Sequence, residues 1–135
     1  MKPQPATLSG KAGTTPLPLS MAMIAGNLVF TSGLVGWDLE TRETSPSIEA
    51  QTTQTLENLK AVLEAAGTSL EYVVKATVYL ANIQDFEAMN QVYRRYFPTN
   101  PPARTTVGVK LAREDLLVEM EMVALLTEKA IFDRN

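Results

Sequence analysis

The sequence predicts an α+β domain in which a mixed sheet of roughly five to six strands carries two helices on one face. Strands are predicted by alternating apolar residues in segments 72–80 and 117–126, and by two apolar runs that flank a Gly-Asn turn. Helices are predicted by two segments in which apolar residues recur every three to four positions. The order of two strands, helix, strand, helix and two strands needs crossover connections, so the sheet must be mixed.

The first two strands are expected at residues 19–24 and 28–32. Between them lies Gly26-Asn27, and both residue types tolerate the positive φ of a tight hairpin turn. A loop over residues 33–44 follows and carries the only tryptophan, Trp37.

The first helix is expected to begin with Ser45 as its N-cap and Pro46 at the first helical position. Gly67 is expected to end it. The residues that recur with the helical period are Ile48, Thr52, Leu56, Leu59, Val62, Leu63 and Ala66.

The second helix is expected to start at a capping box formed by Asn82 and Asp85 and to run to about Phe97, where Pro98 stops it. Asn90 falls inside its apolar stripe, which consists of Phe86, Met89, Tyr93, Tyr96 and Phe97. A buried amide without a hydrogen bond costs about 1–3 kcal/mol. We therefore expect that Asn90 either holds backbone in place or faces a polar cavity.

The strand at residues 101–109 opens with two prolines, which lack the N–H group that the middle of a sheet requires. Alternation puts Thr105 and Val107 on one face, which suits a core. It puts Arg104 and Thr106 on the other face, which suits a small anionic ligand.

In the final strand, Glu119 and Glu121 interrupt an otherwise apolar face. Two helices can cover only one side of the sheet, so the other side would expose a larger apolar patch than monomers usually carry. We therefore expect a symmetric homo-oligomer with the sheets facing inward. The tail at residues 127–135 carries no clear signal.

The length of 135 residues predicts a single domain, residues 1–135, in which residues 1–17 form a loose arm. A net charge of −3 without a basic block argues against a nucleic-acid partner. No apolar run is long enough to span a membrane, and the N-terminus lacks the apolar centre of a signal peptide. Together with the absence of cysteine, this predicts a cytoplasmic protein.

The chain contains neither histidine nor cysteine. This excludes zinc sites built from those residues, and it excludes Ser-His-Asp and Cys-His catalysis. The glycines match no phosphate-binding motif. An enzyme of this composition must work with arginine, carboxylates, hydroxyls, amides, backbone groups and water.

Each candidate residue has a structural alternative. Arg104 is either a ligand anchor, a surface charge, or the partner of Glu119 across the final strands. Asn90 can bind backbone, Ser32 can cap a turn, and Trp37 can serve packing or an interface.

Taken together, the residues resemble the RidA family, also called YjgF/YER057c/UK114, over about residues 17–125. The matching motifs are AGNLVFTSG (25–33), AQT (50–52), LENLKAVLEAAG (56–67), VKATVYL (74–80), DF (85–86), NQVY (90–93), PPARTTV (101–107) and VEME (118–121).

The resemblance implies a chorismate-mutase-like subunit, a homotrimer and ligand clefts between subunits. It implies hydrolysis of enamines or imines of amino acids, such as 2-aminoacrylate/2-iminopropanoate, to 2-keto acids and ammonia, with no metal and no organic cofactor. By position, Arg104 would bind the substrate carboxylate, and Glu119 would hold the attacking water. Thr106 takes a position often held by Cys, whose backbone carbonyl lies near the substrate nitrogen, and Ser32 and Asn90 also match family positions.

The sequence departs from the family at Leu19, where the family commonly has a tyrosine that lines the cleft. Loss of the phenol removes a hydrogen bond and reshapes the pocket. Leu19 and Trp37 therefore suggest an alternative substrate, a larger enamine such as 2-aminomuconate. A further alternative is a trimer without catalysis that binds small carboxylates or acts as a chaperone-like module.

Overall fold

The computed structural model describes residues 2–134, apart from the side chain of Lys11. Three α-helices and seven strands form within this range, together with three short 3-10 turns. The strands are β1 (Gln4–Ala6), β2 (Ala22–Ala25), β3 (Leu28–Thr31), β4 (Leu34–Val35), β5 (Val73–Leu80), β6 (Ala103–Gly108) and β7 (Val118–Leu125), and the helices are α1 (Ile48–Ala65), α2 (Phe86–Tyr96) and α3 (Glu128–Arg134).

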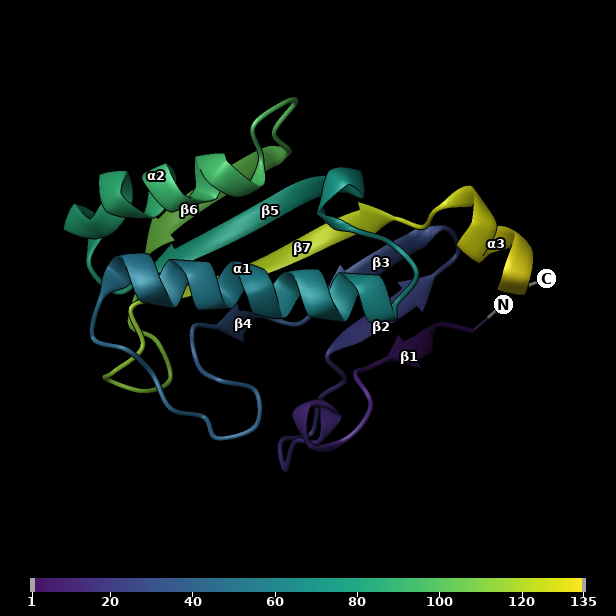
Figure 1. Cartoon of the computed structure of the whole chain (residues 1–135), viewed down its shortest axis with the longest axis horizontal. Coiled ribbons are helices and arrows are strands. Elements are labelled where there is room, and N and C mark those ends of the chain that lie inside the picture. Colours follow the sequence, from purple (N-terminus) through teal and green to yellow (C-terminus); the bar gives the residue numbers. More distant parts are fainter. Residues whose placement is uncertain (1, 135) are drawn as a thin grey trace.

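The strands form one mixed sheet in the order β1-β2-β3-β7-β5-β6, and β4 pairs with β7 beside this path. Only β5 and β6 run parallel; the other pairs are antiparallel. The long helices α1 and α2 lie over the same face of the sheet (Figure 1). The predicted α+β class, the mixed sheet and the two helices on one face are thus confirmed.

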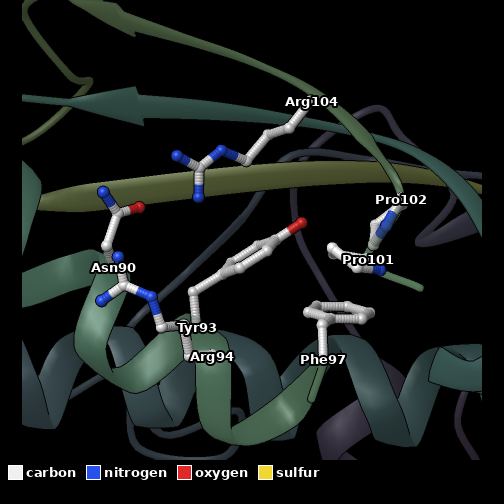
Figure 2. A pocket seen from close by; sticks show the side chains of 7 residues that line it. All are labelled: Asn90, Tyr93, Arg94, Phe97, Pro101, Pro102 and Arg104. Carbon is white, nitrogen blue, oxygen red and sulfur yellow. The ribbon is translucent and has the colours of Figure 1, made fainter. Parts of the chain in front are cut away.

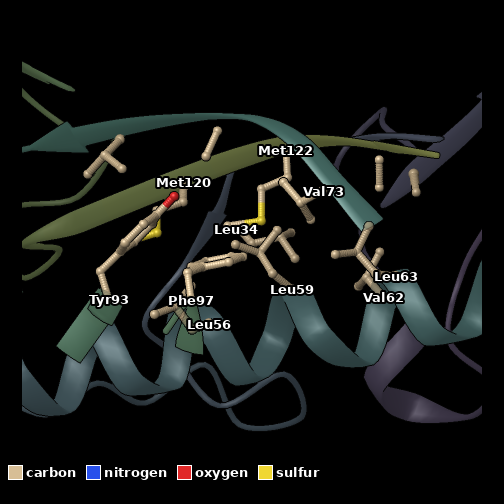
Figure 3. Close-up of a cluster of buried hydrophobic side chains, with 14 of the residues drawn as sticks. Leu34, Leu56, Leu59, Val62, Leu63, Val73, Tyr93, Phe97, Met120 and Met122 are labelled. Carbon is tan, nitrogen blue, oxygen red and sulfur yellow. The ribbon is translucent and has the colours of Figure 1, made fainter. Parts of the chain in front are cut away.

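The core lies between this face and the helices (Figure 3). Leu56, Leu59 and Leu63 of α1 pack toward Met120 and Met122 of β7, and all five side chains are buried. The alternation in β7 determines this arrangement, because every second residue from Val118 to Ala124 points to the helices.

Some elements differ from the sequence prediction. The N-cap of α1 is Ser47, whose hydroxyl accepts a hydrogen bond from the Ala50 N–H at 3.2 Å, so the helix starts two residues after the predicted Ser45-Pro46 cap. The arm predicted to be loose contains β1, which pairs with β2. The tail without a sequence signal forms α3, whose Ala130 packs at Gly67.

The sheet face opposite the helices is left uncovered within one chain. Phe30, Val107 and Leu125 are exposed on it, and their cross-strand partners place them on the side away from the core. No helix among residues 2–134 has the length and apolar character to cross a bilayer.

Candidate active site

Arg104 lies on the edge strand β6 and points toward α2. Its backbone partner in β5 is Ala76, which is fully buried under the helices. The guanidinium carbon lies 4.7 Å from the ring centre of Tyr93 and 5.7 Å from that of Phe86. One terminal nitrogen lies 4.0 Å from the Met89 sulfur. The rings hold the guanidinium by cation–π attraction without using its strong hydrogen-bonding capacity.

No acidic side chain within residues 2–134 pairs with Arg104. Its N–H donors, apart from one thioether contact, therefore remain available to a ligand. A guanidinium in this state suits bidentate binding of a carboxylate. The interpretation of Arg104 as one half of an ion pair with Glu119 is wrong.

A pocket of about 280 Å³ opens in front of this guanidinium (Figure 2). Its lining comes from one side of α2 and from the segment that leads into β6: Asn90, Tyr93, Arg94, Phe97, Pro101, Pro102 and Arg104. Asn90 is 7% exposed, and its amide has no hydrogen-bond partner among the described residues. Of the two roles expected for Asn90, the structure therefore favours facing a polar cavity.

The Tyr93 hydroxyl is also buried and has no hydrogen-bond partner in the described part of the chain. Burial raises the pKa of Tyr93 to about 12, against an opposing effect of the positive charge on Arg104. The phenol therefore stays neutral and can act as a hydrogen-bond donor.

Glu119 lies on β7, opposite Tyr79 of β5 and Val35 of β4. Its carboxylate rests against Gly33, where a Cβ atom would overlap the carboxylate oxygen. Burial raises the pKa of Glu119, and the neighbouring charge of Glu121 adds to the effect. No described residue donates a hydrogen bond to it. A half-buried carboxylate with a raised pKa and free oxygens is suited to hold and deprotonate water.

Glu121 is engaged differently from Glu119. It accepts a hydrogen bond of 2.6 Å from the Tyr79 hydroxyl. That bond is the main reason why the pKa of Tyr79 is raised. Of the two carboxylates on this face, Glu119 is therefore the one left open for chemistry.

Ser32 and Leu19 lie on the Glu119 side of the molecule. The Ser32 hydroxyl donates a 2.6 Å hydrogen bond to the Ser20 carbonyl, which fixes the backbone next to Leu19. Leu19 is exposed and lines, with Gly33 and Trp37, a small hollow of about 70 Å³. The Trp37 ring is held by two guanidinium carbons, 5.6 Å away in Arg42 and 5.1 Å away in Arg113.

Arg104 and Glu119 lie on opposite faces of the sheet. Arg104 pairs with Ala76, and Glu119 pairs with Tyr79, three residues further along β5. Because side chains alternate along a strand, positions three apart point to opposite sides. The expectation that Glu119 lies on the strand next to Arg104 is wrong, since β5 runs between β6 and β7.

The assignment of the two faces of β6 also needs correction. Thr106 pairs with Val78 and lies on the face of Arg104, toward the helices. Thr105 and Val107, expected in the core, are exposed on the uncovered face. The alternation of side chains along β6 was predicted correctly. Because α2 leaves room over this edge strand, however, the face of β6 toward the helices carries the polar residues.

Sequence reasoning did not assign a functional role to Phe86, Met89 and Tyr93, which surround the Arg104 guanidinium, or to Gly33. The first three formed the predicted apolar stripe of α2, so their spacing placed them on one face. The packing of Arg104 onto that stripe depends on the parallel pairing of β6 with β5, which has no local sequence signal.

The mixed sheet with both long helices on one side places the chain in the YjgF-like α+β fold class. The model of the family described as Endoribonuclease L-PSP matches residues 11–126. A RutC family protein of Pyrococcus abyssi is 46% identical over 108 residues, which cover 79% of this chain and 85% of that protein. A protein of Dermatophagoides farinae named 2-iminobutanoate/2-iminopropanoate deaminase is 38% identical over 111 residues, covering 81% of this chain and 86% of that one.

Among solved structures, RidA from the Antarctic bacterium Psychrobacter sp. superposes on this chain with a TM-score of 0.83 and 36% sequence identity. The match covers 91% of this chain and 100% of that one. The chain belongs to the RidA family, as its sequence motifs predicted.

Proposed function

We propose that this protein, as one domain per chain, hydrolyses enamines and imines of 2-amino acids to 2-keto acids and ammonia, without a metal or an organic cofactor. The observation that carries the proposal is the Arg104 guanidinium, which is held by aromatic rings but has no acidic partner among the described residues. The name of the relative from Dermatophagoides farinae supports the same reaction.

The working site is a cleft between copies of the chain. Arg104 and Asn90 supply one half. Glu119, on the opposite face of the sheet, supplies the other half with Ser32 and Leu19, which lie near Gly33. One chain cannot bring both halves to one small substrate, whereas a neighbouring copy can. The exposed apolar residues Phe30, Val107 and Leu125 support burial of the uncovered face in a homotrimer.

In the reaction, Arg104 binds the substrate carboxylate in bidentate fashion and draws electron density from the imine carbon. The Glu119 carboxylate takes a proton from water while the water oxygen bonds to that carbon, and Glu119 passes this proton to the nitrogen as the C=N bond becomes a single bond. Glu119 then takes the proton of the new hydroxyl group and transfers it to the nitrogen while the C–N bond breaks and the C=O bond forms. One water is consumed, and one ammonia and one keto acid leave.

The raised pKa of Glu119 makes it a stronger base than an exposed carboxylate. The backbone carbonyl of Thr106, in the edge strand β6, is the proposed contact for the substrate nitrogen. Such imines already hydrolyse slowly in water, so orientation and one positioned water are sufficient sources of acceleration.

The apolar hollow beside Gly33 favours a second candidate substrate. Leu19 and Trp37 line it together with Leu17 and Met21, so a larger enamine such as 2-aminomuconate has an apolar surface to contact. Faster turnover of such an enamine than of 2-iminopropanoate would favour this candidate over the smaller substrate.

The test is to generate imines in place with an amino-acid oxidase and to measure keto acid and ammonia. We expect the wild-type protein to accelerate both, and Arg104→Ala and Glu119→Gln to fall to the buffer rate. Wild type and Arg104→Ala giving the same background rate would overturn the proposal. Keto-acid binding by the wild type without any hydrolysis would support a carboxylate-binding or chaperone-like trimer instead.

A further inference from the structure

The pocket at Arg104 contains a second cation. Arg94 lies one helical turn after Asn90 on α2, and both line the same pocket as Arg104. Figure 2 shows the two guanidinium groups and the Asn90 amide gathered at one end of this pocket. Asn90 is buried at its floor, and Arg94 is exposed at its rim.

Among residues 2–134, none of these three groups has an acidic partner. The ion pairs of the described residues are Arg113–Asp115 and Lys129–Asp133, and the pocket lining contains no carboxylate. Two guanidinium groups that share one pocket repel each other, and an anion bound between them or beside both would offset this repulsion. The buried Asn90 amide, which lacks a partner in the described chain, is a further donor that a ligand would satisfy.

A monocarboxylate does not use this arrangement fully. A bidentate contact to Arg104 occupies both oxygens of one carboxylate along one side of the fork. Arg94 comes from α2, across the pocket from β6, so its guanidinium approaches a bound acid from the opposite wall (Figure 2). An acid with a second carboxylate at the end of a short side chain would neutralise the guanidinium groups on both walls of the pocket.

We infer that the site is selective for 2-imino acids whose side chain ends in a carboxylate, with Arg104 binding the 2-carboxylate and Arg94 and Asn90 binding the distal one. This inference rests on the proposed deaminase function and specifies its substrate class. Arg94 is a specificity residue in this account and takes no part in the chemical step.

The first test measures binding of two keto acids, 2-oxoglutarate and 2-oxobutanoate, to the full chain by calorimetry. One has a distal carboxylate, and the other ends in a methyl group. We expect the wild type to prefer 2-oxoglutarate, and Arg94→Gln to lower that preference about tenfold, the effect of one charge-assisted hydrogen bond at a partly exposed site. The matched control is Arg95→Gln, which removes the same charge from the next residue of α2, outside the pocket lining, and should leave the preference unchanged.

The second test compares hydrolysis of the imines of glutamate and 2-aminobutanoate, generated in place by an oxidase. The ratio of kcat/KM values should favour the glutamate imine in the wild type and fall about tenfold in Arg94→Gln. Equal losses for both ligands would overturn the inference, because Arg94 would then bind the common carboxylate. A wild-type ratio near one, or an unchanged ratio in Arg94→Gln, would also overturn it.

These outcomes are distinct from failure of the deaminase proposal. If the 2-aminobutanoate imine is hydrolysed in an Arg104-dependent manner while the ratio is unaffected by Arg94→Gln, the reaction stands and the substrate class is wrong. If neither imine is hydrolysed by the wild type, both the reaction and the inferred substrate class fail.

Discussion

Arg104→Lys separates the charge of the arginine from its geometry. The guanidinium carbon lies 4.7 Å from the ring centre of Tyr93, and the side chain lines the pocket. Lysine keeps one positive charge but cannot form two parallel N–H···O bonds to a carboxylate. Loss of one charge-assisted hydrogen bond, about 1.5–3 kcal/mol, predicts a fall of roughly 10- to 150-fold in kcat/KM. Arg104→Ala loses both bonds and the charge, so its fall should reach roughly 10²- to 10⁴-fold.

The assay is steady-state hydrolysis of an imine released by an amino-acid oxidase, followed through the keto acid. Most of the effect should lie in KM, since the carboxylate contact is present in both the bound substrate and the transition state. Thermal unfolding of each variant checks that the fold is retained. Wild-type kcat/KM in Arg104→Lys would refute the bidentate contact, and equal losses in the two variants would refute the role of charge.

Three further variants and one control variant test other parts of the structure. Gly33→Ala places a methyl group where the Glu119 carboxylate lies, so imine hydrolysis should fall at least about tenfold while the unfolding temperature changes little; an unchanged rate would show that Glu119 does not act from this position. Because burial raises the pKa of Glu119 above its usual 4.5, the folded state binds more protons than the unfolded state, and wild-type stability falls as pH rises through that window. Glu119→Gln should therefore be more stable than wild type at neutral pH, with a gap that closes below about pH 4.5; a gap independent of pH would contradict this. Thr52→Val removes a buried hydroxyl without a partner and should raise the free energy of unfolding in urea by about 1 kcal/mol. The control Thr55→Val loses a 2.8 Å hydrogen bond to the Gln51 carbonyl and should not raise the free energy of unfolding. Destabilisation by Thr52→Val would show that the Thr52 hydroxyl has a hydrogen-bond partner.

The fold was largely predictable because its signals are local. Alternation in residues 117–126 and the helical period between Ile48 and Ala66 each determine an element and its buried face. The exact cap at Ser47 was missed because Ser45-Pro46 offers an equally good local signal two residues earlier. The tail helix α3 was missed because its docking at Gly67 is a tertiary contact.

The sequence selected the candidate site residues, but it did not predict how they are arranged. Arg104 and Asn90 do share a pocket. The relation of Arg104 to Glu119 depends on strand order, and the placement of β5 between β6 and β7 is set by long-range pairing that no short segment encodes. Because of this strand order, the two residues lie on opposite faces of the chain and not in one cleft.

The most direct test of the account is complementation between two inactive variants. Arg104→Ala and Glu119→Ala are each expected to be inactive alone. If each site takes Arg104 from one copy and Glu119 from its neighbour, unfolding the two variants together and refolding them as an equal mixture should restore about a quarter of the wild-type activity, since random assembly makes about one site in four complete. The same variants mixed after separate refolding provide the control. No recovery after joint refolding, with mixed oligomers shown to be present, would contradict a site shared between copies.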